Sequence, residues 1–419
     1  MSFSLLDTQQ VYPRIIPRHG IGNAEASATN AVLVTVLQDA FSRLTTILGA
    51  YYLGTLLYPE AKSYRLLADI TNDMAIVLDL LSPQLSHYSL TATFPFISHS
   101  PGTSLRMVAL CLSGAFRALC GVAAGGAKAA ITLHFAQDGA VPGDVGDLSA
   151  KDASKETVLA LAGMLCGSML MPYLHTAERT YTVVAVLLVL HIWINYVAVR
   201  VVVMKTLNRQ RATILWAAYS GFYSPDNNKE KHNKSRRVLS PSDVASREYL
   251  FGSNSVLLSC HRGGPMRLTG YAKIGVPFAS LTASHPWFTQ LSVTPSTEAA
   301  LQELIDIFAD TRYIVGWDLS LPTVPIPPRL SIILKDGHDQ NAHLQAWIVA
   351  SVVSSCAGEA ATHADMLRIA KSAKETVLHL YQDFVADLQR AGWHTDTNGI
   401  LTGAARTVRV ERSDDRKSR

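Results

Sequence analysis

Polar residues at helical spacing inside apolar stretches are the parts of this chain that could do chemistry. Arg65, Asp69 and Asp73 are each four residues apart, and Asn72 lies on the same face of a helix predicted over 62–81. In a membrane bundle this face would point inward, because charges at membrane depth are costly. In a soluble amphipathic helix it would face water. The sequence leaves both arrangements open for residues 27–81.

A second polar group comes from a long apolar helix predicted over 103–137. It contains Arg117, Lys128 and His134. Arg117 is the deepest of these cations and needs a carboxylate partner, for which Asp39, Asp69 and Asp73 are the candidates. Buried charges that lack partners cost several kcal/mol, so they require internal pairing or a polar ligand. The predicted ligand-binding set is Arg65, Asp69, Asn72, Asp73, Arg117, Lys128, His134, Lys151 and Asp152.

An enzymatic alternative rests on Lys151-Asp152 and Lys155-Glu156, which could supply a Schiff-base lysine or an acid/base pair. No set of nucleophile, base and orienting residue accompanies them. Lysines at the start of a helix are usually solvated charges. We therefore expect no enzymatic activity, no catalytic residue, no cofactor and no metal site.

Two apolar runs, 157–174 and 180–199, are long enough to cross a bilayer as a helical hairpin. Asp152 or Ser154 is the expected N-cap of the first. Residues 200–240 contain nine Lys and Arg, which the positive-inside rule places on the cytosolic or an equivalent side. On the preceding helix, Gly114, Ala118, Gly121 and Gly125 form a small-residue seam suited to close helix packing.

The domain organisation follows from these patterns. A mostly α chain is predicted, with a multi-helix membrane bundle followed by a smaller α+β soluble domain. The predicted segments are a lead (1–22), the helical membrane domain (23–215), a basic linker (216–247), the α+β domain (248–411) and a disordered tail (412–419). In the α+β domain, strands are expected within 249–260, 267–281, 313–319 and 329–334, and helices over 296–310, 341–357 and 364–391.

Composition agrees with a protein that is part membrane and part soluble. Hydrophobic residues make up 48% and charged residues 17%, with a net charge of +4. The small charge, with basic residues not interleaved with aromatics, argues against a nucleic-acid partner. The five cysteines form no CxxC pair and read as small buried residues in a reducing compartment. No secretory signal precedes the first helix.

Several runs, in this order, resemble the root UVB sensitive (RUS) family. They are Gly20-Ile-Gly-Asn-Ala24, Tyr64-Arg-Leu-Leu-Ala-Asp-Ile-Thr-Asn-Asp73, Gly121-Val-Ala-Ala-Gly-Gly-Ala127, His134, Leu148-Ser-Ala-Lys-Asp-Ala-Ser154, Glu156-Thr157, Asn195-Tyr-Val-Ala-Val-Arg200 and Thr206-Leu-Asn-Arg-Gln-Arg211. Three departures stand out: a short lead over 1–19, Lys128 where the family usually has arginine, and Lys155 where it usually has glutamine.

The resemblance implies an intracellular membrane protein of an organelle or the endomembrane system, here of a fungal type. The family is linked to vitamin B6 homeostasis, its paralogues act together, and no enzymatic activity is established for it. Our first expectation is a membrane protein that handles or senses a small polar ligand, a phosphorylated B6 vitamer being one candidate. The alternative is a membrane-anchored scaffold that binds a paralogue or a second copy through the amphipathic helix 364–391.

Overall fold

The computed structural model describes residues 28–88, 105–137, 144–220, 238–260, 264–282, 295–321, 323–360 and 362–410. The chain divides into two compact units, residues 1–202 and 203–419. The predicted lead and tail, and the middle of the predicted linker (221–237), fall largely outside the described residues. The mostly α architecture, with all strands of the described residues in the second unit, confirms the helical and α+β parts of the predicted fold class.

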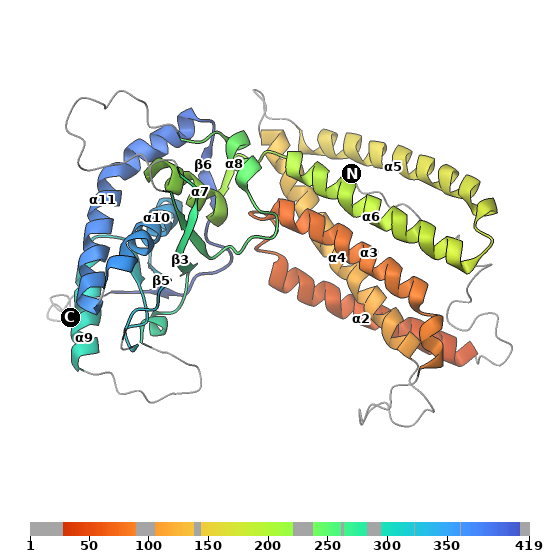
Figure 1. The fold of residues 1–419 in the computed structure, drawn as a ribbon, viewed down its shortest axis with the longest axis horizontal. Helices are drawn as coiled ribbons and strands as arrows, with labels where there is room; N and C mark the ends of the chain where they lie inside the picture. The colour runs from red at the N-terminus through yellow and green to blue at the C-terminus, as the bar shows by residue number, and fades with distance from the viewer. Residues whose placement is uncertain are drawn as a thin grey trace. The chain divides into compact units, whose positions relative to one another are not determined.

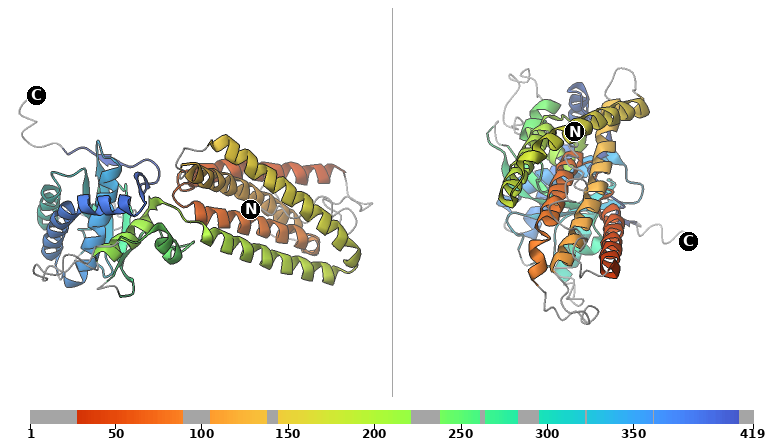
Figure 2. Two further views of the ribbon diagram at one scale, coloured as in Figure 1. Left: turned by 90° about the horizontal axis from the view of Figure 1, so that it is seen from above. Right: turned by 90° about the vertical axis from the view of Figure 1, so that its right-hand side faces the viewer.

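The first unit is all helical. Its helices are α2 (Ala28–Leu53), α3 (Ala61–Leu81), α4 (Leu105–Gln137), α5 (Val145–Leu170) and α6 (Ala177–Val201), with short 3-10 turns η3 (Gln84–His87) and η4 (Met171–Tyr173). α4 packs between α2 and α3, and α6 packs on the far side of α3 (Figures 1 and 2). α4 is continuous through Gly125 and Gly126, where a break would have divided it. α3 and α6 therefore face each other across a single interface.

Small residues bring α4 close to its neighbours. A Cβ added at Gly114 would lie 2.7 Å from Ser42 Oγ on α2, and one at Gly126 would lie 2.3 Å from Leu57 Cδ1. The predicted seam is thus divided, because a Cβ at Gly121 or Gly125 would meet nothing within 4 Å. On the other side of α4, the Ser113 hydroxyl donates to the Ala75 carbonyl of α3 at 3.2 Å.

α5 and α6 form the predicted hairpin, joined at η4 (Figure 1). Asp144 caps α5 by accepting a hydrogen bond from the Gly146 N–H. The helix thus begins at Val145, ahead of the N-cap expected at Asp152 or Ser154. No residue of α5 is buried. Three helices, Leu105–Gln137, Val145–Tyr173 and Ala177–Val201, are long and apolar enough to cross a membrane.

The second unit contains a mixed sheet with strand order β2-β3-β5-β4, with β7 also pairing with β5. The strands are β2 (Val256–Ser259), β3 (Arg267–Ile274), β4 (Tyr313–Gly316), β5 (Arg329–Lys335) and β7 (Thr407–Val408). β3 and β5 are parallel, whereas β2 with β3 and β4 with β5 are antiparallel. β1 (Thr206–Asn208) and β6 (His394–Gly399) form a separate parallel pair.

Helices complete the second unit. They are α7 (Arg209–Ser220), α8 (Pro241–Arg247), α9 (Pro295–Ile307), α10 (Gln340–Cys356) and α11 (His363–Arg390), with the 3-10 turns η5 (Phe278–Leu281) and η6 (Ala357–Glu359). α10 contacts β2, β3, β4 and β5, and α11 packs on α10 and α9 (Figure 1). Trp317, Trp347, Ile332 and Phe384 lie in one buried core. The predicted helices over 296–310, 341–357 and 364–391 are therefore present with small shifts in their ends.

The boundary between the units differs from the sequence prediction. The helical domain was predicted to extend to residue 215, but the chain divides after Val202. The reason is that β1 pairs with β6, and α7 packs on β2 and α10. Ile214, Leu215 and Trp216 of α7 are buried in the core of the second unit. The end of the predicted membrane domain is thus part of the α+β unit.

Candidate functional site

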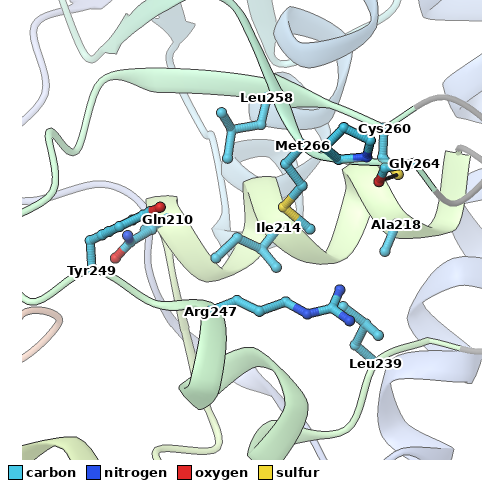
Figure 3. Close-up of a pocket in the computed structure, with 11 residues that line it drawn as sticks. Gln210, Ile214, Ala218, Leu239, Arg247, Tyr249, Leu258, Cys260, Gly264 and Met266 are labelled. Atoms are coloured by element: carbon cyan, nitrogen blue, oxygen red, sulfur yellow. Dashed lines mark hydrogen bonds between the residues drawn. The ribbon is translucent and has the colours of Figure 1, made fainter.

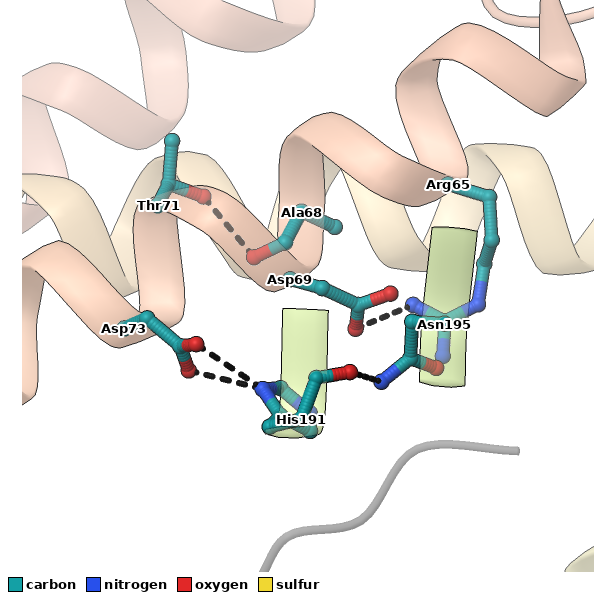
Figure 4. Close-up of polar contacts among 7 residues, drawn as sticks. All are labelled: Arg65, Ala68, Asp69, Thr71, Asp73, His191 and Asn195. Atoms are coloured by element: carbon teal, nitrogen blue, oxygen red, sulfur yellow. Dashed lines mark hydrogen bonds and ion pairs between the residues drawn. The ribbon is translucent and has the colours of Figure 1, made fainter. Parts of the chain in front are cut away.

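A buried polar cluster lies between α3 and α6 of the first unit (Figure 4). Arg65 donates to Asp69 Oδ1 at 2.9 Å, across one helical turn of α3. One turn further, Asp73 faces His191 of α6, whose Nδ1 lies 2.9 and 3.0 Å from the two carboxylate oxygens. The Asn195 amide donates to the His191 carbonyl at 2.9 Å. The cluster thus joins two helices far apart in sequence.

The cluster is buried, and two of its polar side-chain atoms have no hydrogen-bond partner among the described residues. The side chains of Asp73 and His191 are each 10% exposed, and that of Asp69 is 7% exposed. Among the described residues, neither Asp69 Oδ2 nor His191 Nε2 has a hydrogen-bond partner. Because His191 Nδ1 faces a carboxylate, it carries a proton, so Nε2 accepts a hydrogen bond when the ring is neutral and donates one when the ring is charged. Two buried polar atoms are therefore available to a ligand that can donate and accept, as a hydroxyl group can.

An apolar groove of about 610 Å³ adjoins this cluster. Asp73 is its only carboxylate among the described lining residues, and the other walls come from α3 and α6. The apolar and aromatic lining residues are Ile70, Met74, Val77, Leu188, Val189, Ile192, Trp193 and Tyr196. The volume is in the range of small-molecule sites. The groove can therefore admit an apolar body to the edge of a polar pair.

The structure separates the predicted ligand-binding residues into different places. Arg65, Asp69 and Asp73 lie in the cluster, and the half-buried Asn72 follows the same helix without a hydrogen bond to another described residue. His134 is buried at the far end of α4.

The predicted cations lie in ion pairs. Arg117 binds Asp79, whose side chain is 2% exposed. The sequence prediction, which gave Asp39, Asp69 and Asp73 as the candidate partners of Arg117, was therefore wrong. Side chains in a helix lean toward its N-terminus, so Arg117 reaches back along α4 to the end of α3.

Lys128 and Lys151 also differ from the predicted set. Lys128 bridges α4 to α5 through Asp152 and Glu156, at 3.0 and 2.8 Å. Lys151 pairs with Asp147 on the exposed side of α5, at 2.7 Å. Asp152 is therefore a structural partner of Lys128, and Lys151 lies apart from the α3–α6 cluster.

His191 and Asn195 complete the cluster, although the sequence prediction did not include them. His191 lies within the apolar run 180–199. The available signal was the spacing of four residues between two polar side chains, which puts both on one face of α6. Asp79 and Glu156 could be recognised only once the helix packing was known.

The second unit holds its own buried ionisable groups, among them His343. Its Nε2 lies 2.7 Å from His338 Nδ1, and burial, with the nearby His338, lowers the pKa of His343 to about 4. Burial raises the pKa of Tyr313 and of Tyr381 well above the usual range. Among the described residues, no group of three or more His, Cys, Asp or Glu is placed to hold a metal ion.

Arg211, the last residue of the run Thr206–Arg211, forms a buried ion pair with Glu248. Arg211 Nη2 is 2.8 Å from Glu248 Oε1, and these side chains are 2% and 5% exposed. Arg211 Nη1 also donates to the Thr206 carbonyl at 2.9 Å, and the Asn208 side chain accepts from the Arg211 backbone N–H. This part of the family-like sequence is thus engaged inside the second unit.

Comparison with known proteins identifies the family. Residues 3–221 match the family model described as the vitamin B6 photo-protection and homoeostasis domain. The chain is 33% identical over 246 residues to "Protein root UVB sensitive 3" of Arabidopsis thaliana, covering 58% of this chain and 47% of that protein. It is 27% identical over 242 residues to "RUS family member 1" of Dictyostelium discoideum, covering 57% and 40%.

A longer alignment reaches the second unit. The chain is 24% identical over 397 residues to "Protein root UVB sensitive 2, chloroplastic" of Arabidopsis thaliana, covering 94% of this chain and 74% of that protein. This chain spans less than half the length of the first two relatives. No solved structure matches it. That it is of a fungal type stays a prediction. Because the matching domain covers more than half of the sequence, the chain belongs to the root UVB sensitive (RUS) family, whose domain is linked to vitamin B6 photo-protection and homeostasis.

Proposed function

We propose that the first unit is a non-enzymatic, membrane-embedded module that holds a small polar ligand at the α3–α6 cluster. The supporting observation is a pair of buried polar atoms without hydrogen-bond partners, Asp69 Oδ2 and His191 Nε2, beside the groove at Asp73. A buried polar atom without a partner costs about 1–3 kcal/mol. A ligand with hydroxyl or amine donors would recover that energy by filling both atoms.

The charges of the cluster narrow the ligand class. The four predicted cations, Arg65, Arg117, Lys128 and Lys151, are each paired with a carboxylate. A phosphate would have to displace one of these pairs, whereas the hydroxyl groups of an unphosphorylated ligand meet polar atoms that have no hydrogen-bond partner. We therefore favour an unphosphorylated B6 vitamer, such as pyridoxine or pyridoxamine, over the phosphorylated form that the sequence suggested.

Binding is tested on the full chain in lipid nanodiscs by thermal unfolding with pyridoxine, pyridoxamine or pyridoxal phosphate. A ligand at a hundred times its Kd stabilises the protein by about 2.7 kcal/mol. We expect pyridoxine or pyridoxamine to raise the Tm of the wild type and to leave that of Asp73→Asn unchanged. Asp39→Asn is the matched control, since Asp39 lies on exposed α2 with a side chain 70% exposed. No shift with any vitamer contradicts the ligand proposal.

The membrane location is supported by the apolar outer faces of the helices. The side chains of Met169, Val189 and Val201 are 72%, 72% and 73% exposed, and α5 buries none of its residues. A helix of 25 residues, such as α6, spans about 37 Å and exceeds a bilayer core of about 30 Å. Lipid would cover these faces. We propose an intracellular membrane, organellar or endomembrane, with the basic linker on the cytosolic or equivalent side.

Extraction at high pH tests this location. We expect the protein to remain in the membrane pellet, and Cys166, which is exposed on α5, to be protected from a water-soluble thiol reagent. A Cys placed at His175, next to the turn of the hairpin, should react only from the side opposite the linker. Release into the supernatant, with Cys166 labelled from water, would contradict a spanning hairpin.

The second candidate is a membrane-anchored scaffold that binds a paralogue or a second copy. The amphipathic helix behind this idea, α11, has its apolar face in the core of the second unit, including Met366, Val377 and Phe384. A partner would need another surface. The open face of α4 at Gly121 and Gly125 suits close helix contact. Gly121→Leu should then abolish cross-linking between copies or paralogues, and unchanged cross-linking would exclude this face.

A further inference from the structure

A pocket in the second unit is separate from the α3–α6 cluster. It lies between α7, the end of α8 and the β2–β3 hairpin, with a volume of about 550 Å³ (Figure 3). Gln210, Ile214 and Ala218, spaced four residues apart on α7, form one wall. Leu258 and Met266 face them from the hairpin. The volume is that of a small-molecule site, and most of its surface is apolar.

One cation extends across this apolar pocket. The side chain of Arg247, at the last turn of α8, runs below Ile214 and Met266 toward Leu239 (Figure 3). Its guanidinium makes no hydrogen bond or ion pair with any other described residue. Asp243, one turn earlier on α8, feels the charge of Arg247 but forms no ion pair with it, and its carboxylate accepts hydrogen bonds from the backbone N–H and the hydroxyl of Ser240.

Neither of the two nearby carboxylates, Asp243 and Glu248, forms an ion pair with Arg247. The adjacent carboxylate, Glu248, is taken by the buried Arg211 at 2.8 Å. A solvent-accessible guanidinium beside an apolar wall can bind a carboxylate or phosphate through two parallel hydrogen bonds. Among the described lining residues, the pocket therefore combines a surface for an apolar body with one positive charge, that of Arg247.

Local hydrogen bonds hold both ends of the pocket. In the orientation that satisfies both groups, the Gln210 amide donates to the Tyr249 carbonyl and accepts from the Tyr249 N–H, at 3.1 and 2.9 Å. At the other end, Cys260 Sγ donates to the Gly264 carbonyl at 3.0 Å. The walls are thus connected by contacts that do not use the Arg247 guanidinium.

We propose that this pocket binds a small molecule with an apolar ring and a single anionic head, a phosphate or a carboxylate. The head contacts Arg247, and the ring lies against Ile214, Leu258 and Met266. This preference differs from that proposed for the α3–α6 cluster, which takes an unphosphorylated ligand because the predicted cations of the first unit are already paired. The two sites can therefore be tested independently, because each selects a different ligand charge.

Protection of Cys260 from alkylation measures occupancy at the pocket itself. The full chain in nanodiscs is treated with N-ethylmaleimide in the presence of phenyl phosphate, phenol or inorganic phosphate. Alkylation of each cysteine is then read by mass spectrometry. We expect phenyl phosphate to half-protect Cys260 at a concentration at least about tenfold lower than phenol or inorganic phosphate, a factor worth about 1.4 kcal/mol. Cys356, which is partly exposed at the end of α10 and does not line the pocket, serves as the internal control.

Substitution of Arg247 distinguishes the proposed site from nonspecific hydrophobic binding. Arg247→Met should remove the advantage of phenyl phosphate over phenol. Arg329→Met, an equal charge change at an exposed position at the start of β5, should leave it intact. Equal protection by all three compounds, protection by inorganic phosphate alone, or unchanged protection in Arg247→Met would overturn the proposal. Because Arg247 is exposed and unbonded, its removal leaves the fold in place.

Discussion

Removal of Glu248 should strongly destabilise the second unit. In Glu248→Gln, the Arg211 guanidinium keeps its bond to the Thr206 carbonyl but loses its buried counter-charge. Breaking a buried ion pair by removing one partner costs about 3–5 kcal/mol. A domain has about 5–15 kcal/mol of stability in total, so this loss is a large share of it.

The cost arises from the isolated charge rather than from the lost contact. Arg211→Met combined with Glu248→Leu removes both charges and refills the space with apolar groups. Such replacements are often close to neutral, although here the Thr206 carbonyl loses a donor at a cost of about 1–3 kcal/mol. The double variant should therefore be more stable than Glu248→Leu alone.

Urea unfolding followed by tryptophan fluorescence measures these differences, because Trp216, Trp317 and Trp347 are buried in the second unit. Arg390→Met is the control, since the Arg390 side chain is 75% exposed, and it should change stability by less than about 0.5 kcal/mol. The reasoning is refuted if Glu248→Gln costs less than about 1 kcal/mol. It also fails if the double variant is as unstable as the sum of its single changes.

One further prediction concerns the pH dependence of the second unit, and another concerns helix packing in the first. The second unit should lose up to about 3 kcal/mol of stability as the pH falls from 6.5 to 4, because the pKa of His343 is lowered to about 4 in the fold and only the unfolded chain gains the proton above that pH. The urea midpoint should fall less steeply with decreasing pH in His343→Gln, and identical slopes would count against this. In the first unit, Gly126→Ala places a Cβ 2.3 Å from Leu57 and should lower the stability by about 1–3 kcal/mol. Gly121→Ala, which has open space around the new Cβ, should not lower it. Thermal melting in nanodiscs compares the two variants, and equal melting temperatures would argue against close packing at Gly126.

Element positions were largely accessible from the sequence because they depend on local patterns. α3 ends at Leu81, the last residue of the predicted helix 62–81. The apolar run 157–174 corresponds to the second half of α5 with η4, and the run 180–199 falls within α6. Such signals require only hydrophobic period and helix-breaking residues. The start of α5 was missed because Asp144, in a turn-rich stretch, supplies its N-cap.

The pairing of side chains was less accessible, because it depends on how helices cross. Arg65, Asp69 and Asp73 could be placed on one face by spacing alone. The partner of Arg117 could not, since Asp79 becomes available only through the packing of α4 on α3. His191 was separated from Asp73 by more than a hundred residues, and only the contact of α6 with α3 brings them together.

The continuation of β1 and α7 into the second unit has a consequence for how this family's proteins should be divided in the laboratory. The region recognised by sequence ends at residue 221, whereas the chain folds as units that separate after Val202. A fragment cut at the end of the recognised region would leave the remaining chain without Leu215 and Trp216, both buried in its core. The region that matches the family model therefore does not coincide with a compact unit of the structure. Expression fragments should begin at Val203, and truncations that end near 221 should be read as damage to both pieces.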